Sequence, residues 1–249
     1  MSGAGVSVVV PALNEAGELP ATLAHLFALD PPPREVVVAD GGSADGTADL
    51  AAAAGGVVVR SPPGRAVQMN AGAAAATGDV LCFVHADTRP SPGYLAAVAA
   101  ALGDPATVLV GGRCTLAGPA GVSRLTTLHH RAKTHYGPLL YAPLAYARGL
   151  RLLFGDQAPA CRAADFAAAG GFDEHLPVME DADLCVRLNR DLRGGRGRVR
   201  ELPAPVLTSD RRVRAAGPVR ANLTYLAVGW GWACGVSPDR LGRWYAGGR

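Results

Sequence analysis

Hydrophobic residues fall into two alternating patterns in the first half of the chain. Short valine-rich runs, typical of buried strands, occupy residues 6–10, 36–39, 57–59 and 80–84. Between these runs, alanine and leucine recur at helical spacing in residues 18–29, 47–54, 66–76 and 92–102. Strand–helix alternation of this kind predicts right-handed βαβ units and a mostly parallel sheet.

The pattern is less regular in the second half. It predicts one more strand at residues 108–116, a short helix at 163–169 and a longer helix from Glu180 to about Leu192. Segment 122–153 is rich in His, Tyr, Leu and Arg, and we assign no element to it. Neither an internal repeat nor a linker is evident, so we predict a single α/β domain over residues 1–249.

Composition narrows the class of protein. Hydrophobic residues make up 49% of the chain and charged residues 18%, which indicates a folded domain, and the net charge of +3 gives no sign of a nucleic-acid partner. The five cysteines form no C-x-x-C pair, so we expect a reducing compartment and neither a zinc site nor a disulfide framework. No secretory signal precedes the first strand, and the apolar stretch 223–236 is too short to cross a bilayer. The sequence therefore predicts a cytoplasmic protein.

Polar side chains follow three of the predicted strands at the point where each strand ends. Glu15 follows the first strand, Asp40 ends the second, and His85 and Asp87 follow the fourth. Ligands of parallel sheets bind at this edge, so these side chains are candidates for function. Asp40 stands before two glycines that let a ligand approach, and we interpret it as accepting hydrogen bonds from a nucleobase or ribose. Asp45 is equally consistent with a turn and helix cap.

Asp87 is the candidate metal ligand. An acid on a turn after an apolar strand can bind a divalent cation that neutralises a diphosphate leaving group. Its structural alternative is an N-cap for the helix near Pro92, but Asp87 lies too far upstream for that role. We therefore favour the metal.

Several motifs, taken together, resemble glycosyltransferase family 2. They are Pro11-Ala12-Leu13-Asn14-Glu15, the run from Asp40 to Thr47, and the later Glu180-Asp181. Residues 64–72 (Gly-Arg-Ala-Val-Gln-Met-Asn-Ala-Gly) and 85–88 (His-Ala-Asp-Thr) are similar to a bacterial subfamily named for its radical-SAM and selenium-linked gene neighbours. The resemblance covers nearly the whole chain, including residues 155–157 and 235–238.

The resemblance implies a GT-A fold, which is a single Rossmann-like nucleotide-binding domain with a mostly parallel mixed sheet and a helical C-terminal part. Residues 1–116 would form the nucleotide-sugar-binding half, 117–220 the acceptor and catalytic half, and 221–249 a C-terminal helical tail. It also implies a nucleotide-diphosphate sugar as donor substrate and a divalent cation, Mg²⁺ or Mn²⁺.

Site residues follow from the resemblance by position. The nucleoside would be held by Pro11, Leu13, Glu15 and Asp40. Arg65 and Asn70 would reach the donor phosphate or ribose, and Asp156 and Gln157 would shape the acceptor or donor-sugar site. Asp87 matches the last acid of the family's Asp-x-Asp metal motif. The first acid of that motif is replaced here by His85, and because imidazole favours softer metals than Mg²⁺, the replacement bears on the identity of the metal.

Glu180 and Asp181 begin the predicted helix that follows residues 170–177. Two acids in a first turn can simply complement the helix dipole. The family pattern instead makes Asp181 the general base that takes a proton from the acceptor hydroxyl, with Glu180 beside it, in a one-step displacement that inverts the anomeric carbon. We expect this inverting transfer.

Ten arginines lie between Arg187 and Arg220, against three acids, and Trp230 and Trp232 follow. Such a run is usually a solvated face, but this tail could also lie on the anionic inner face of a membrane. His129, His130 and His135 lack the spacing of a metal site, and we expect them to be solvated or packed on aromatic rings.

Two other classes of protein stay open. A nucleotidyltransferase should carry a glycine-rich phosphate loop with a lysine near the N-terminus, whereas the only lysine is Lys133. A non-catalytic nucleotide-sugar-binding protein would have no need of Glu180 and Asp181 in register.

Overall fold

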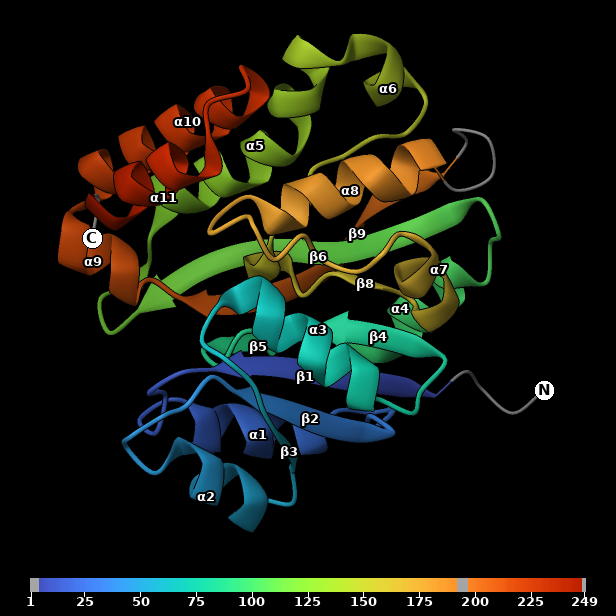
Figure 1. Ribbon diagram of the computed structural model, residues 1–249, viewed down its shortest axis with the longest axis vertical. Helices are drawn as coiled ribbons and strands as arrows, with labels where there is room; N and C mark the ends of the chain where they lie inside the picture. Colours follow the sequence, from blue (N-terminus) through green and yellow to red (C-terminus); the bar gives the residue numbers. More distant parts are fainter. Residues whose placement is uncertain (1–4, 192–196, 248–249) are drawn as a thin grey trace.

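A twisted sheet runs through the protein in the strand order β3-β2-β1-β4-β8-β6-β9-β5, with β7 paired to β6 (Figure 1). The computed structural model describes residues 5–191 and 197–247. The strands are β1 (Val6–Ala12), β2 (Glu35–Asp40), β3 (Val57–Arg60), β4 (Val80–Phe83), β5 (Thr88–Pro90), β6 (Thr107–Gly118), β7 (Gly121–Val122), β8 (Ala160–Arg162) and β9 (Arg198–Ser209).

Helices cover both faces of this sheet. They are α1 (Leu19–Phe27), α2 (Thr47–Ala53), α3 (Arg65–Ala75), α4 (Tyr94–Leu102), α5 (Arg124–Tyr141), α6 (Pro143–Ala147), α7 (Ala163–Ala168), α8 (Glu180–Asp191), α9 (Arg211–Ala216), α10 (Pro218–Ala233) and α11 (Pro238–Gly247), with a 3₁₀ turn η1 (Gly155–Gln157). This is the mixed, mostly parallel α/β domain that the sequence predicts.

The first half of the chain confirms the predicted rhythm closely. β3, β2, β1 and β4 are parallel neighbours, and the register pairs Val8 with Val36 and with Cys82. The valines of β1, β2 and β4 are almost fully buried on both faces of the sheet, which is why these strands read as continuous apolar runs, whereas Val57 of the edge strand β3 is 46% exposed. Because β2, β1 and β4 are adjacent, their carboxyl ends bring Asp40, Glu15 and Asp87 to one edge, as predicted.

The long strand β9 was not predicted. It lies parallel to β6, and buried Val199, Leu202 and Val206 alternate with more exposed residues. Arginines fill the exposed positions at its start, and Pro203 and Pro205 interrupt its pattern near the register shift against β6. Prolines are usually confined to strand edges and irregularities, so this sequence resembles a loop although it forms a central strand.

Helices α5, α6, α10 and α11 form a layer at one end of the molecule, at the top of Figure 1. α5 and α10 lie side by side. Asn222 of α10 forms hydrogen bonds with Thr126 and His129 of α5, and the ring centroids of Trp230 and Tyr141 are 5.5 Å apart. α5 and α6 fall in the segment to which the sequence assigned no element, whereas the predicted C-terminal helical tail is present as α10 and α11. In the described part of the chain, every helix is too short or too polar to cross a bilayer.

Candidate active site

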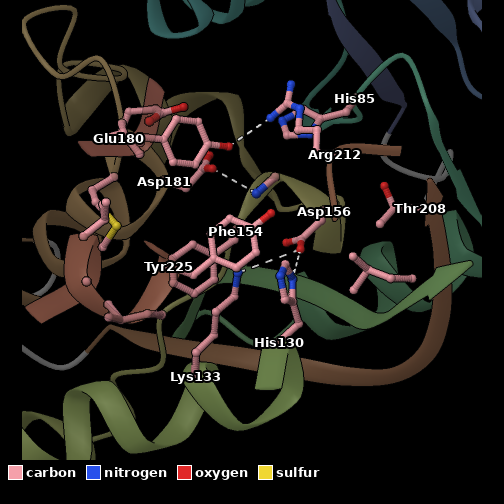
Figure 2. A pocket seen from close by; sticks show the side chains of 18 of the residues that line it. His85, His130, Lys133, Phe154, Asp156, Glu180, Asp181, Thr208, Arg212 and Tyr225 are labelled. Carbon is pink, nitrogen blue, oxygen red and sulfur yellow. Dashed lines mark hydrogen bonds and ion pairs between the residues drawn. The ribbon is translucent and has the colours of Figure 1, made fainter. Parts of the chain in front are cut away.

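A pocket lies between the carboxyl edge of the sheet and the helical layer (Figure 2). Both halves of the chain supply its walls. Its polar lining consists mainly of Arg65 at the start of α3, His85 and Asp87 after β4, His130 and Lys133 of α5, Asp156 of η1, Glu180 and Asp181 of α8, Arg212 of α9, and Tyr225 and Tyr245 of α10 and α11. The tail therefore forms part of the site.

Asp181 enters this pocket from the first turn of α8. Met179, just before the helix, adopts a left-handed backbone with φ of 72°, an unfavourable conformation for a side chain of this kind. One oxygen of Asp181, Oδ2, accepts a hydrogen bond of 2.9 Å from the backbone N–H of Gly155. The other, Oδ1, is buried without a hydrogen-bond partner among the described residues. Burial, then the neighbouring Glu180, raise the pKa of Asp181 to about 7.

Glu180 is paired instead with a cation of the sheet half. Its carboxylate lies 3.0 Å from the guanidinium of Arg65, and only 1% of the Glu180 side chain is exposed. Arg65 also shares Tyr245 with Arg212, whose Nη1 donates to the tyrosine hydroxyl at 3.0 Å. Burial acts to raise the pKa of Tyr245, but the two guanidiniums lower it overall. Two cations from distant parts of the sequence thus meet at one side chain of α11.

His85 and Asp87 lie together on the turn after β4. The His85 imidazole is buried against Gly155, where any side chain would collide with it, and its Nε2 lacks a partner in the described structure. Burial, then Arg65 and Arg212, lower the pKa of His85 to about 3, so the ring is neutral at neutral pH. Burial raises the pKa of Asp87.

Arg211 joins the two strand-end acids. Its Nη2 lies 2.7 and 2.9 Å from the Glu15 carboxylate oxygens and 3.6 Å from Asp87 Oδ2. In the sequence, Arg211 and Arg212 belong to the arginine run that we expected to be a solvated face. Their position directly after a strand end is the signal that could have identified them, but the strand β9 itself was not recognised.

The expected nucleoside-binding residues lie at the rim, outside the pocket. Pro11 lies near the end of β1, paired with Ala39 of β2, and Leu13 follows the strand and is 43% exposed. The buried Asp40 carboxylate accepts hydrogen bonds from the backbone N–H groups of Gly42 at 3.1 Å and Ser43 at 3.2 Å. Asp40 therefore shapes the loop at the rim.

Asn70 and Gln157 also lie outside the pocket lining. Asn70 does not reach toward it, because its amide donates to the Phe172 carbonyl and accepts from the Phe172 N–H, both at 2.9 Å. Gln157 is buried, donating to the Gly112 carbonyl at 3.1 Å and accepting from the Phe154 N–H at 3.1 Å. Each amide is occupied by backbone groups, so both residues fix loops around the site.

A second polar cluster occupies the side of the pocket formed by α5. His130 bonds Asp156 through Nδ1, and Lys133 Nζ lies 3.9 Å from the same carboxylate. Lys133 also lies 3.9 Å from the centre of the Phe154 ring. As expected, His130 packs edge-on against the Tyr225 ring, with centroids 5.2 Å apart, and His129 stacks with Tyr136, but the bond from His130 to Asp156 was not anticipated. No pattern in the sequence pointed to His130 or Lys133, because α5 was not recognised as a helix.

Solved structures share this architecture. Glucosyl-3-phosphoglycerate synthase from Mycobacterium tuberculosis, in complex with Mn²⁺, UDP and glucosyl-3-phosphoglycerate, gives a TM-score of 0.63 at 22% identity, covering 94% of this chain and 81% of that one. TarS 1–349 from S. aureus gives 0.60 at 17% identity over 98% and 71%. At these identities the likeness establishes the GT-A fold alone.

Curated relatives match by sequence. The pre-mycofactocin glycosyltransferase of Mycobacterium tuberculosis is 30% identical over 219 residues, which are 84% of this chain and 43% of that protein. An uncharacterized glycosyltransferase of Mycobacterium bovis is 38% identical over 119 residues, which are 47% and 53%. The chain thus spans about half the length of the curated relatives it matches. The model of the family described as glycosyl transferase family 2 matches residues 7–162, more than half of the chain, which therefore belongs to that family.

Proposed function

We propose that this protein transfers a sugar from a nucleotide-diphosphate donor to an acceptor hydroxyl, with inversion at the anomeric carbon. The observation that carries this proposal is the Asp181 carboxylate, one oxygen of which is fixed by Gly155 while the other is buried at the pocket without a partner in the described structure. A carboxylate held in this way can accept a proton in a fixed direction.

The reaction balances in one displacement. The acceptor hydroxyl attacks the anomeric carbon, its proton passes to Asp181, and the bond from that carbon to the diphosphate breaks with its electron pair on the leaving oxygen. Glu180 stays paired with Arg65, and its charge is neutralised there. We therefore assign the proton transfer to Asp181 and only a supporting role to Glu180.

Asp87 and His85 are the residues that would hold Mg²⁺ or Mn²⁺. A carboxylate and a neutral imidazole nitrogen, the latter buried without a partner among the described residues, form a donor set that fits such a cation, and fits Mn²⁺ better than Mg²⁺. The cation would supply positive charge to the leaving diphosphate. Solved relatives of this fold contain Mn²⁺ or Mg²⁺ with UDP, which supports the assignment.

The donor would lie across the carboxyl edge of the sheet. Its nucleoside would sit on the rim of Pro11, Leu13 and Asp40, and Glu15 with Arg211 would separate that rim from the pocket. Arg65 would face the phosphates and Asp156 the transferred sugar. Arg65 and Asp156 line the pocket with Asp181, which supports this order.

The competing classes are less well supported. The only lysine lies in α5 rather than in a phosphate loop near the N-terminus, unlike the arrangement that a nucleotidyltransferase needs. Glu180 and Asp181 both enter the pocket, which a binding protein would not require.

We further propose a cytoplasmic location, with peripheral contact to the inner face of the membrane through the C-terminal part. The arginines between Arg187 and Arg220 do not form one basic face for this contact, because several of them are paired with acids. Arg187 pairs with Asp183, Arg211 with Glu15 and Arg214 with Asp210. Arg193 and Arg196 lie outside the described residues.

The test is the stereochemistry of the product. Purified protein, screened against a panel of nucleotide sugars with Mn²⁺, should hydrolyse one donor slowly without an acceptor, and NMR should detect the product with the opposite anomeric configuration. Retention of configuration would overturn the mechanism. Transfer of a nucleotidyl group, or no turnover of any donor that binds, would overturn the proposed class.

A further inference from the structure

The outer side of the helical layer exposes large apolar residues. On α10, Val219, Leu223, Leu226 and Trp230 are 65, 60, 38 and 42% exposed. They are spaced by four, three and four residues, which places them on one face of the helix. Single exposed apolar residues are common on protein surfaces, but a helix face made of large apolar residues is not.

The neighbouring helices continue this surface. Leu125 and Leu128 of α5 are 63 and 66% exposed, and Leu144 of α6 is 73% exposed. Asn222 bonds Thr126 near one end of the α5–α10 contact, and Trp230 meets Tyr141 near the other. The two helices therefore run alongside each other over most of their length. We call the exposed residues of α5, α6 and α10 the outer apolar face.

The charge of this region has a single sign. Segments 122–155 and 211–238, which contain α5, α6, α9 and α10, have no Asp or Glu. Exposed arginines flank the apolar residues, among them Arg124, Arg148 and Arg220. Arg220 also lines a groove between α10 and α11, together with Val219, Leu223 and Trp244. A guanidinium beside apolar side chains suits a lipid phosphate above an acyl chain.

We propose that the outer apolar face docks the protein on an anionic lipid surface. The proposal rests on the proposed glycosyl transfer and adds to it the class of acceptor, a membrane-borne or amphipathic molecule. A second copy of this chain fits less well as the occupant, because it would bring two acid-free, arginine-bearing surfaces together.

The same helices line the pocket with their inner sides. The inner side of α5 contributes His130 and Lys133 to the pocket, and the inner side of α10 contributes Tyr225 and Val228. One helix layer thus separates the pocket from the outer apolar face. An acceptor hydroxyl at the headgroup level of a docked membrane would be separated from the pocket by this one layer of helices.

The test is sedimentation of the full chain with vesicles, at low and at physiological salt. Vesicles of phosphatidylcholine with about 30% phosphatidylglycerol should bind the protein, and pure phosphatidylcholine should bind it weakly. The double variant Leu128→Glu/Leu223→Glu removes apolar contact and adds like charge to the bilayer, so its partition should fall about tenfold or more. Leu50→Glu, a 40% exposed leucine of α2 at the opposite end, is the matched control and should bind as wild type does.

Slow hydrolysis of the donor without acceptor separates this proposal from the proposed function. Both variants should keep it, since none of the changed residues lines the pocket. Absence of wild-type binding to anionic vesicles at low salt, or equal binding by the double variant, overturns the docking surface. A dimer that the double variant dissociates, with no vesicle binding, assigns the face to a second copy and also overturns it. Vesicle binding without any donor turnover leaves the surface standing and removes the enzymatic proposal.

Discussion

The sheet half and the helical layer differ in the sign of their charge. Residues 5–121 carry ten acids and five arginines, whereas segments 122–155 and 211–238 carry cations and no acid. The pocket lies where these two regions meet, and Arg211–Glu15 is an ion pair formed across that boundary. The acids gather where a metal and a nucleotide would be held. The cations and aromatic rings close the pocket from the other side.

The difference shows what each region contributes. Parallel strands fix the strand-end acids through backbone hydrogen bonds, so their positions vary little with the loops around them. The helices of the layer are held by side-chain contacts such as Asn222 with Thr126. We therefore expect the sheet half to govern the donor and the metal, and the helical layer the acceptor.

The largest expected effect lies on the boundary itself. Asp181→Asn keeps the shape and the Gly155 hydrogen bond but removes the basic oxygen, so kcat should fall by about 10²–10⁴-fold while donor affinity is retained. Steady-state kinetics and calorimetry with the nucleotide of the donor identified in the panel measure the two quantities. Glu180→Gln, the neighbouring acid, should lose less, and full turnover by Asp181→Asn would refute its role as base.

On the sheet side, Asp87→Ala should remove the dependence of donor binding on Mn²⁺. The carboxylate is the principal ligand that we assign to the cation, so without it the affinity for the nucleotide of the donor identified in the panel, measured by calorimetry, should be the same with Mn²⁺ and with EDTA. Asp45→Ala is the matched control at the same edge. Its carboxylate accepts hydrogen bonds from the backbone of Ala16 and Thr47, and its loss should leave the effect of Mn²⁺ intact. Persisting Mn²⁺ dependence in Asp87→Ala would move the metal elsewhere.

The acidity of Asp181 gives a prediction with a definite sign. Burial and Glu180 raise its pKa to about 7, so the protonated form, which cannot act as a base, accumulates below that pH. The rate should fall about tenfold per pH unit on the acidic side and level off above about pH 8. A pH profile of kcat with saturating donor measures this limb. Asp181→Asn should lack it, and an unchanged limb in that variant would assign the titration to another group.

The smallest effect concerns Asn70, whose side chain holds the backbone of Phe172 outside the pocket. Asn70→Ala removes two hydrogen bonds to the Phe172 backbone, so the free energy of unfolding should drop by about 1–3 kcal/mol, measured by urea denaturation. Affinity for the donor nucleotide, measured at low temperature where the variant stays folded, should be unchanged. Weakened nucleotide binding with unaltered stability would place Asn70 in the donor site.

Sequence reasoning succeeded where one local pattern determines the structure. The runs at Val36 and Val80 are buried on both faces, so their apolar pattern alone identifies them as strands. β9 could not be identified in this way, since its arginines and prolines resemble a loop and only the pairing with β6 makes it a strand. Asp87 was recognisable from its position after a strand. Lys133 was not, because its place beside Asp156 depends on packing between α5 and η1.

The guanidinium between Glu15 and Asp87 has a consequence for the resting protein. Two carboxylates from separate loops are held near each other before any ligand arrives, and Arg211 acts as their internal counterion. Without it, mutual repulsion would push the loops after β1 and β4 apart. An incoming divalent ion must therefore compete with a charge that the chain already provides. Metal affinity then reflects an exchange of cations, and Arg211→Gln should tighten Mn²⁺ binding if the loops keep their places.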